Sequence, residues 1–289
     1  MRIAITGYAS LDHVAMLDGI PGPGRTTTII DRPDGAWPRL GGSPAFVAAA
    51  LVRNGIPQAY PVSWIGDDEA GRTYRSQLER NEVPGDGLEA VPGARTPVAI
   101  LAYEPQGGCI CLYHPGVPEG LRLSENQKRI LERAGWICVT VGPPEATRGV
   151  LDIIRDDQKL AWVVKHDPRA MSPELASRLA ARADLICHSH AESEFLRAAL
   201  EASGNSRAGQ ILIETRGGQG ASFRRAGESI FVASEPLSVP DPTGAGDTFA
   251  GGVLAALAKG ETDPAAIVQA GHDAARALLG ARCRQTESA

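Results

Sequence analysis

The stretch 239–252 constrains this 289-residue chain more than any other part of it. It has the sequence VPDPTGAGDTFAGG and leads directly into the apolar run 253–258. Its two prolines interrupt regular structure, and its central glycines leave the backbone without side-chain bulk where a helix begins. The first turn of a helix carries unpaired N–H groups and the positive end of the helix dipole, which suits phosphate oxygens. We therefore predict an anion-binding turn formed by Gly244, Ala245 and Gly246.

Asp247 lies inside this predicted turn, where its negative charge would repel a bound phosphate. One interpretation is that Asp247 caps the helix, since aspartate is a favoured N-cap residue. The other is that it acts as a general base and takes a proton from a hydroxyl that attacks phosphorus. Because glycines on both sides of the turn exceed what a cap requires, we favour the general base.

The composition narrows the classes of partner. A hydrophobic content of 43% and a charged content of 22% are those of an ordinary globular protein. A formal net charge of -5 gives no electrostatic footprint for nucleic acid or an anionic membrane, so we expect a small-molecule partner. The N-terminal apolar run is too short for a signal peptide and no run spans a bilayer, so we expect a cytoplasmic protein.

The five cysteines are odd in number and mostly lie in apolar runs, which is typical of reduced thiols in a core. Cys109 and Cys111 lack a second pair at zinc-ligand spacing. His188 and His190 are separated by one residue and have no third ligand in view, so we expect a loop after a strand there rather than a metal site.

The second half of the chain alternates between helix and buried strand. This order predicts a mostly parallel sheet covered on both faces. The predicted helices are 124–134, 144–155, 172–183, 192–202 and 264–279, and the predicted strands are 136–141, 160–165, 185–188, 210–214 and 221–225. The first half adds a strand at 3–6, a helix with Ser43 as its N-cap, a strand from residue 60 and a helix over 69–83.

Short β segments in the first half predict a separate flap. The runs 98–103 and 109–113 are joined by a glycine- and proline-containing turn, which is a hairpin signal. An exposed β segment at 26–30 completes a small β flap over a cleft. The sequence 114–116, His-Pro-Gly, follows this hairpin and is typical of a turn.

Three further groups of residues are candidates for ligand contact. Asp12 is expected just past the carboxyl end of the strand 3–6, where open α/β sheets bind ligands, although a plain turn residue is the alternative. The pair Gly41 and Gly42 lets the backbone approach a ligand or makes a tight turn. The loop after the strand 210–214 can cradle phosphate or ribose, or simply connect two strands. Its candidate residues are Thr215, Arg216, Gly217 and Gly220.

The chain contains neither a Gly-x-x-x-x-Gly-Lys-Ser/Thr loop nor a Gly-x-Gly-x-x-Gly fingerprint. Instead, the motif 241–251, the glycines 41–42, the Gly-Asp-Asp-x-x-Gly segment 66–71 and the loop 215–220 resemble, in order, the ribokinase-like, or PfkB, family of carbohydrate and nucleoside kinases. The resemblance covers nearly the whole chain. It implies one α/β domain over 1–289, a three-layer sandwich with a mostly parallel central sheet, and a small β lid built from segments near 13–40 and 95–115.

The resemblance implies a kinase that uses ATP and Mg²⁺ to transfer the γ-phosphate to a primary hydroxyl of a small sugar. A nucleoside kinase of the same family is the alternative acceptor class, and a non-catalytic small-molecule sensor with this fold is the alternative of another class. Asp247 would deprotonate the hydroxyl, and the turn 244–246 would stabilise charge on the transferred group. Asp12, Gly41, Gly42 and Thr96 would lie on the substrate side.

The resemblance also suggests ion sites and two departures from the family pattern. Asp241 and Thr243 match positions near a monovalent cation, K⁺ in activated members. Phe46 stands where many sugar kinases have a substrate-binding Asn, and an aromatic ring can stack on a nucleoside base. In the family's Asn-x-x-Glu pattern, Ala191 replaces the Asn while Glu194 is kept, for Mg²⁺ bound through water. In relatives the lid can serve as a dimer interface, so a homodimer is expected.

Overall fold

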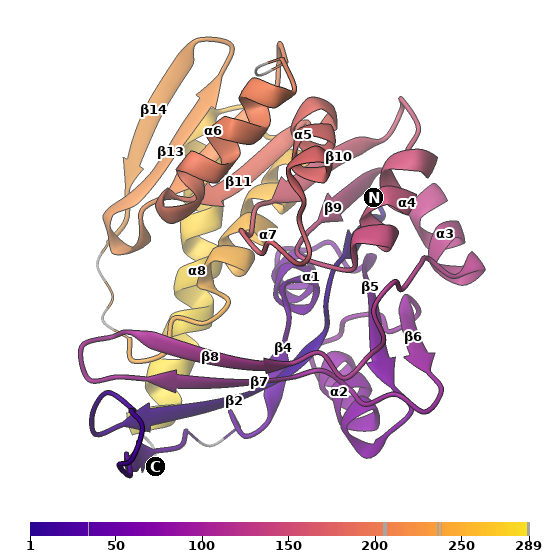
Figure 1. Cartoon of the computed structure of the whole chain (residues 1–289). Helices are drawn as coiled ribbons and strands as arrows, with labels where there is room; N and C mark the ends of the chain where they lie inside the picture. The colour runs from indigo at the N-terminus through magenta and orange to yellow at the C-terminus, as the bar shows by residue number, and fades with distance from the viewer. Residues whose placement is uncertain (34, 205–206, 236, 238, 288–289) are drawn as a thin grey trace.

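The computed structural model of the protein describes residues 1–33, 35–204, 207–235, 237 and 239–287 (Figure 1). Residue 34 of the expected lid segment 13–40, and residues 288–289 of the expected domain 1–289, lie outside the described residues. Within the described part the strands form a large sheet and a separate small sheet. No described helix combines the length and the apolar character that crossing a membrane requires.

The large sheet has the spatial order β14-β13-β12-β11-β10-β9-β1-β5-β6 in the described part of the chain. Its strands pair in parallel except at one edge, where β13 is antiparallel to both β12 and β14. The strands are β1 (Ile3–Thr6), β5 (Ala59–Gly66), β6 (Leu88–Val91), β9 (Trp136–Val139), β10 (Lys159–Val163), β11 (Leu185–Ser189), β12 (Ile211–Thr215), β13 (Gly220–Arg225) and β14 (Glu228–Ala233).

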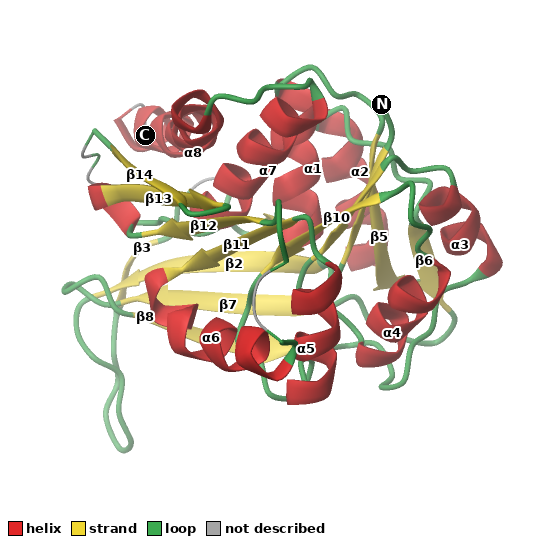
Figure 2. Cartoon of the chain, turned by 90° about the horizontal axis from the view of Figure 1, so that it is seen from above, coloured by secondary structure: helices red, strands yellow, loops and turns green. Residues whose placement is uncertain are grey.

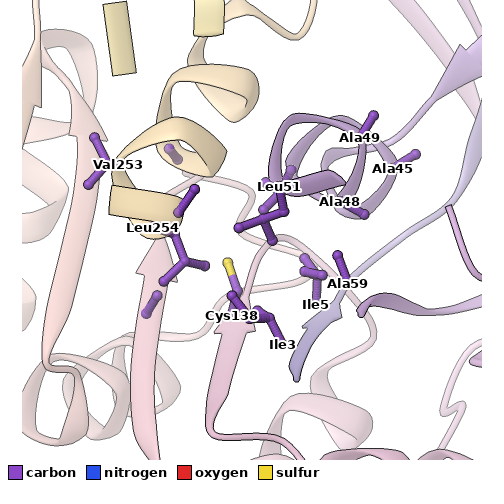
Figure 3. Packing of buried hydrophobic residues seen from close by; sticks show 14 of the residues in the cluster. Ile3, Ile5, Ala45, Ala48, Ala49, Leu51, Ala59, Cys138, Val253 and Leu254 are labelled. Carbon is purple, nitrogen blue, oxygen red and sulfur yellow. The ribbon is translucent and has the colours of Figure 1, made fainter. Parts of the chain in front are cut away.

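Helices cover both faces of this sheet (Figure 2). One face carries α1 (Ser43–Arg53), α2 (Glu69–Arg80), α7 (Ala245–Ala258) and α8 (Pro264–Glu287), and the other carries α3 (Glu125–Glu132), α4 (Pro144–Ile153), α5 (Pro173–Arg182) and α6 (Ser193–Ala202). Side chains of a strand alternate between faces, so Ile3 and Ile5 belong to the first core and Ala4 to the second. Figure 3 shows Leu51 and Leu254 packed in the first core.

The predicted three-layer architecture with a mostly parallel central sheet is confirmed, while several element boundaries differ. Gly42, not Ser43, is the N-cap of α1, and α8 runs beyond the predicted 264–279. The strands β6, β14 and β4 (Arg39–Gly41) were not expected from sequence. They are short, and β14 is largely exposed, so neither length nor apolar content announces them.

The small sheet has the order β3-β2-β7-β8, with β4 paired to β2. It consists of β2 (Ser10–Leu17), β3 (Ile29–Asp31), β4, β7 (Val98–Tyr103) and β8 (Cys109–His114), and the predicted hairpin of β7 and β8 is present. Asp12 lies within β2, a strand that was not expected from sequence, and is paired to Arg39 and Ala99, so the alternative of a plain turn residue was wrong.

The cysteines divide between the core and the small sheet. Cys138 and Cys187 are buried as expected, whereas Cys109 and Cys111 are exposed on β8 and Cys283 is partly exposed. The apolar run that contains Cys109 and Cys111 is a strand whose side chains are mostly exposed, so hydrophobicity alone did not indicate a core there.

Helix α7 fits between α1 and α8 because it has glycines at both contacts. A Cβ on Gly251 would lie 2.6 Å from Ala50 Cβ and 2.8 Å from the Val47 carbonyl oxygen of α1. A Cβ on Gly252 would lie 2.4 Å from the Ala270 carbonyl oxygen of α8. These distances are too short for any side chain, so the second half of the 239–252 motif serves to pack α7 closely.

We predict that Gly251→Ala lowers the free energy of unfolding by about 1–3 kcal/mol, because an extra methyl overpacks the contact of α1 and α7. Gly149→Ala in α4 is the matched control, since its Cβ would meet only the movable Leu123 side chain, at 3.2 Å. Alanine is also the better helix former at both positions. Urea unfolding of both variants checks this; an unchanged midpoint for Gly251→Ala would contradict the packing argument.

Candidate active site

The candidate site lies where the carboxyl ends of the parallel strands meet the N-terminus of α7. Asp247 lies in the first turn of α7. The charges of Lys165 and Glu192, which follow β10 and β11, act on the pKa of Asp247. Both strands run parallel in the sheet, so their carboxyl ends share one edge. The 239–252 motif therefore faces the sheet edge at which open α/β sheets bind ligands.

Gly244 is the N-cap of α7 and has a left-handed backbone, with φ of 75°. A Cβ on Gly244 would lie 2.6 Å from the ring of Phe46, so the position excludes other residues for two reasons. Ala245 N donates to Pro242 O at 3.1 Å, which engages one of the predicted anion donors inside the protein. Gly246 is exposed and would tolerate a Cβ without contact, which leaves its backbone open to a ligand.

The environment of Asp247 suits a proton acceptor. Burial raises its pKa, while a hydrogen bond from Ser43 and the charge of Lys165 lower it in part. A carboxylate with a raised pKa holds a proton more strongly than an exposed one, which is what a general base near neutral pH requires. Ser43, expected only as a helix cap, therefore belongs to the site, at the N-terminus of α1.

Asp12 is a buried carboxyl group, with only 3% of its surface exposed. Ser10 Oγ donates to its Oδ1 at 2.6 Å, and burial raises the pKa of Asp12 to about 6. A Cβ on Gly41 would lie 2.1 Å from Asp12 Oδ1, and one on Gly42 would lie 2.4 Å from Tyr8 O. The two glycines thus make room for Asp12 and for the neighbouring backbone.

A pair of arginines surrounds Asp241 just before the α7 turn. Arg39 Nη1 donates to Asp241 Oδ2 at 2.5 Å, and Arg282 Nη1 lies 3.5 Å from the same oxygen. Although burial raises it, the hydrogen bond and charge of Arg39, with the charge of Arg282, hold the pKa of Asp241 at about 2. Thr243 N donates to Asp241 Oδ1 at 3.1 Å, and Thr243 Oγ1 hydrogen-bonds the Tyr103 hydroxyl of β7.

A cavity of about 210 Å³ connects the predicted nucleotide loop to the anion turn. Thr215, Gly217 and Gly220 line it on one side and Gly246 on the other, with α8 residues closing it. The Arg216 side chain is directed elsewhere, since its Nε donates to Glu214 Oε1 at 3.0 Å. Three of the four predicted loop residues therefore lie on a cavity that reaches the α7 N-terminus.

The predicted magnesium residue Glu194 is exposed in the first turn of α6, and Ala191 is exposed as well. Glu192 is the acidic residue whose charge acts on Asp247, and its Oε2 accepts from Ser189 N at 2.9 Å. Ser189 and Glu192 have the same spacing as the family's Asn-x-x-Glu pattern, with Ser in place of Asn. The sequence interpretation placed Ala191 and Glu194 on this pattern instead.

Thr96 is buried, and its hydroxyl hydrogen-bonds two protein groups. Its hydroxyl donates to Asp68 Oδ1 at 2.6 Å and accepts from Gly66 N at 3.0 Å, and Asp68 also caps α2. The Gly-Asp-Asp-x-x-Gly segment therefore anchors the residues that precede β7. The only proton of the Thr96 hydroxyl is thus donated to Asp68, so this hydroxyl has none to donate to a substrate.

Phe46 is held by protein groups on both sides. Its ring lies against Gly244, and the Arg282 guanidinium carbon lies 6.0 Å from the ring centroid. The ring also lines a cavity of about 850 Å³ bordered by α1, α2, α8 and the small sheet. Phe46 thus supports the α7 turn and also presents part of its ring to this cavity.

The strand register of the small sheet separates its two faces. Asp12, Tyr103, Cys111 and Tyr113 share one face, and the rings of Tyr8 and Tyr113 are 6.3 Å apart. The Tyr103 hydroxyl on this face hydrogen-bonds Thr243, just before the α7 turn. The face of the small sheet that carries Asp12 therefore also carries aromatic and thiol groups.

Sequence reasoning missed Arg39, Lys165 and Arg282, which join the site from β4, the end of β10 and α8. No local pattern marks these cations, although the position of Lys165 after a predicted strand was a usable signal. The two histidines 188 and 190 have different partners, Ser189 O and Glu214 Oε1. Among the described residues no group of His, Cys, Asp and Glu is arranged to hold a metal ion alone.

Comparison with known proteins identifies the relatives of this arrangement. The ATP-dependent ribose-1-phosphate kinase of Halopiger xanaduensis is 26% identical over 88% of this chain and 84% of its own length. The nucleoside kinase of Methanothermobacter thermautotrophicus is 24% identical over 88% of this chain and 82% of its own. The structure of a putative ribokinase II of E. coli with ATP and Mg²⁺ superposes with a TM-score of 0.77 at 21% identity, covering 96% of this chain and 92% of that one.

The sequence profile of the pfkB family of carbohydrate kinases matches residues 2–287, nearly the whole chain. The structural relatives share the fold, and the curated relatives are kinases of sugars and nucleosides. The chain therefore belongs to the pfkB carbohydrate kinase family and is a phosphotransferase that acts on a sugar or nucleoside alcohol.

Proposed function

We propose that this protein transfers the γ-phosphate of ATP to a primary hydroxyl of a small sugar, with Asp247 as the general base. The observation that carries the proposal is a partly buried carboxylate of raised pKa in the first turn of a helix whose N-terminus opens onto a cavity. A helix N-terminus attracts phosphate, so a base placed there meets both reactants.

The chemistry follows from this placement. Asp247 takes the proton of the acceptor hydroxyl while the hydroxyl oxygen attacks the γ-phosphorus. The new oxygen–phosphorus bond forms as the bond from the γ-phosphorus to the bridging oxygen breaks, and ADP leaves with that electron pair. The exposed backbone at Gly246 and the helix dipole stabilise the charge on the transferred group. Lys165, whose charge already reaches Asp247, lies on the same edge and can pair with phosphate.

The donor side is the cavity of about 210 Å³ lined by Thr215, Gly217 and Gly220. We infer that it receives the nucleoside part of ATP, because it ends at the α7 N-terminus where the phosphates would lie. The E. coli relative was solved with ATP and Mg²⁺, which supports the same donor here.

The residues of this edge also fit Mg²⁺. Glu192 offers an oxygen ligand close enough to affect Asp247, and Mg²⁺ in kinases keeps several waters and few carboxylate ligands. Glu192 would therefore hold the ion through water, in place of the exposed Glu194. Bound Mg²⁺ supplies charge neutralisation on the phosphates of ATP.

The acceptor side is the face of the small sheet that carries Asp12. When ionised, Asp12 accepts hydrogen bonds from substrate hydroxyls. The small sheet that carries Asp12 excludes water, so that ATP is not hydrolysed. This role of the small sheet as a lid, and the single domain 1–289, follow from the family resemblance and the position of β2 and β7.

A nucleoside is the second candidate acceptor, and Tyr8 with Tyr113 favours it. Their rings lie near Asp12 and offer aromatic surface to a base. A thermal-shift screen with a non-hydrolysable ATP analogue separates the two: stabilisation by pentoses or hexoses alone supports the sugar, and stabilisation by nucleosides alone supports the alternative. The complete base and anion turn give no support to a non-catalytic sensor.

The use of ATP supports a cytoplasmic location for the protein.

The outer face of the small sheet supports a homodimer. Ile100 and Leu112 are neighbours on the face opposite Asp12 and are 39% and 59% exposed. Exposed apolar side chains on a sheet favour association with a second copy.

We expect Leu112→Glu to shift the mass measured by light scattering from dimer to monomer; a wild-type monomer would contradict this.

We predict that Asp247→Asn lowers kcat by about 10²–10⁴-fold, since the amide cannot take up the proton. Binding of the ATP analogue should persist, because the turn 244–246 and the cavity are unchanged. Asp263→Asn, an exposed acid at the start of α8, is the control and should keep wild-type turnover. Undiminished turnover of Asp247→Asn would remove it as the base.

We predict that Asp12→Asn stabilises the unliganded protein relative to the wild type as pH rises. Folding raises the pKa of Asp12 to about 6, so the folded state binds the Asp12 proton more strongly than the unfolded state does. The free energy of unfolding of the wild type therefore falls as pH rises from about 4 to about 6. The expected gain of the variant between pH 4.5 and pH 7.5 is roughly 2 kcal/mol, because part of the effect of the pKa shift is already present at pH 4.5. Denaturant unfolding at both pH values checks it; an equal difference at both would contradict the burial argument.

A further inference from the structure

The backbone that leads into the α7 turn is coordinated by the side chain of Arg282. Its Nη1 donates to Thr243 O at 2.7 Å and to Asp241 O at 3.0 Å, and lies 3.5 Å from Asp241 Oδ2. The Nη1 atom of Arg282 thus lies close to two carbonyl oxygens and one carboxylate oxygen of Asp241 and Thr243, which precede Gly244. This is the kind of oxygen cluster that otherwise requires a cation.

The guanidinium keeps its charge in this position. Burial and the nearby Arg39 lower the pKa of Arg282 to about 10, which leaves it cationic at neutral pH. The side chain is only 15% exposed, and the stem and head lie near the ring of Phe46. A delocalised guanidinium suits such a dry position better than an ammonium because it is more weakly hydrated.

The charges that the described residues bring to this cluster balance without a further cation. Asp12 and Asp241 carry two negative charges, and Arg39 and Arg282 carry two positive charges that act on both of them. An added monovalent ion would leave this buried cluster with a net positive charge, which burial disfavours. It would also compete with Arg282 for the carbonyl oxygens of Asp241 and Thr243.

These residues therefore do not fit the monovalent cation that the family resemblance suggested for Asp241 and Thr243. We infer that Arg282 is a built-in cation that orders the anion turn, so that this kinase works without K⁺. Arg282 is a positioning residue: it acts on the turn 244–246 through the carbonyl groups of the preceding residues. The inference rests on the proposed kinase function, in which that turn meets the γ-phosphate.

The hydrogen bond between Tyr103 and Thr243 connects the backbone that Arg282 binds to the small sheet. The Tyr103 hydroxyl of β7 hydrogen-bonds Thr243 Oγ1, while Arg282 binds the carbonyl of the same residue. Thr243 is thus held from the small sheet on one side and from α8 on the other. Removal of Arg282 should therefore loosen the turn and leave its three oxygen atoms available to a small cation.

The test compares turnover of the wild type and Arg282→Ala in KCl and in tetramethylammonium chloride at equal ionic strength. The wild type should have the same kcat in both salts. Arg282→Ala should lose roughly ten- to hundredfold in tetramethylammonium, because a loosened turn misplaces the reacting groups. Added K⁺ or guanidinium ion should restore part of that loss. Arg178→Ala, which removes an exposed ion pair of α5 with Asp152, is the control and should respond to neither ion.

A second readout needs no acceptor. The melting temperature of the wild type should be equal in the two salts, whereas that of Arg282→Ala should be higher in KCl, since an ion that binds the folded state stabilises it. If no acceptor is phosphorylated, the proposed function fails, while melting still decides the role of Arg282. If Arg282→Ala does not fold, Arg282→Lys takes its place, and the wild-type comparison stands by itself.

Three results would overturn the inference. The first is a wild type that turns over several-fold faster, or melts higher, in KCl than in tetramethylammonium chloride. The second is an Arg282→Ala variant with undiminished kcat in tetramethylammonium. The third is a loss of activity that neither K⁺ nor guanidinium reduces, which would make Arg282 an ordinary structural contact.

Discussion

The close packing of α7 between α1 and α8 is the constraint on which the site depends. Gly251 and Gly252 allow backbone and methyl contacts that no side chain would permit, and they fix the axis of α7 over the sheet. Its N-terminus then lies at the carboxyl ends of the strands, and Asp247 comes into the range of Lys165 and Glu192. A helix held less rigidly would not keep a base and an anion-binding turn in register with two substrates.

Two carboxylates of the same motif have opposite electrostatic environments. Asp241 meets two arginines, which hold its pKa at about 2 and fix it as a structural anion. Asp247 meets mainly burial, which raises its pKa and suits proton transfer. Divergent pKa values of neighbouring acids are a common way to assign separate roles at one site. Arg39 and Arg282 thus keep Asp241 ionised beside the turn, and Asp247 is the carboxylate suited to accept a proton.

Sequence reasoning found what local pattern encodes and missed what only the tertiary fold brings together. The alternation of helices and strands, the hairpin and the α7 turn could be predicted because spacing and glycine placement determine them. The strand β2, which contains Asp12, was not predicted because it is defined by its pairing with β7, which is far away in the chain. Glu192, which we propose for Mg²⁺ in place of Glu194, lies in a short turn before α6 that local pattern does not mark. Arg282 lies on a different helix from its partners, so no local signal connects them.

A crystal structure with a non-hydrolysable ATP analogue and Mg²⁺ tests the assignment of the α7 turn most directly. The account predicts the nucleoside in the cavity beside Gly217 and Gly220, the terminal phosphate at the backbone of Gly246, and the Asp247 carboxylate facing the γ-phosphorus across the space for a hydroxyl. Arg282 should remain bound to the carbonyl groups of Asp241 and Thr243. A terminal phosphate bound away from the α7 N-terminus, with Asp247 remote from it, would contradict the account.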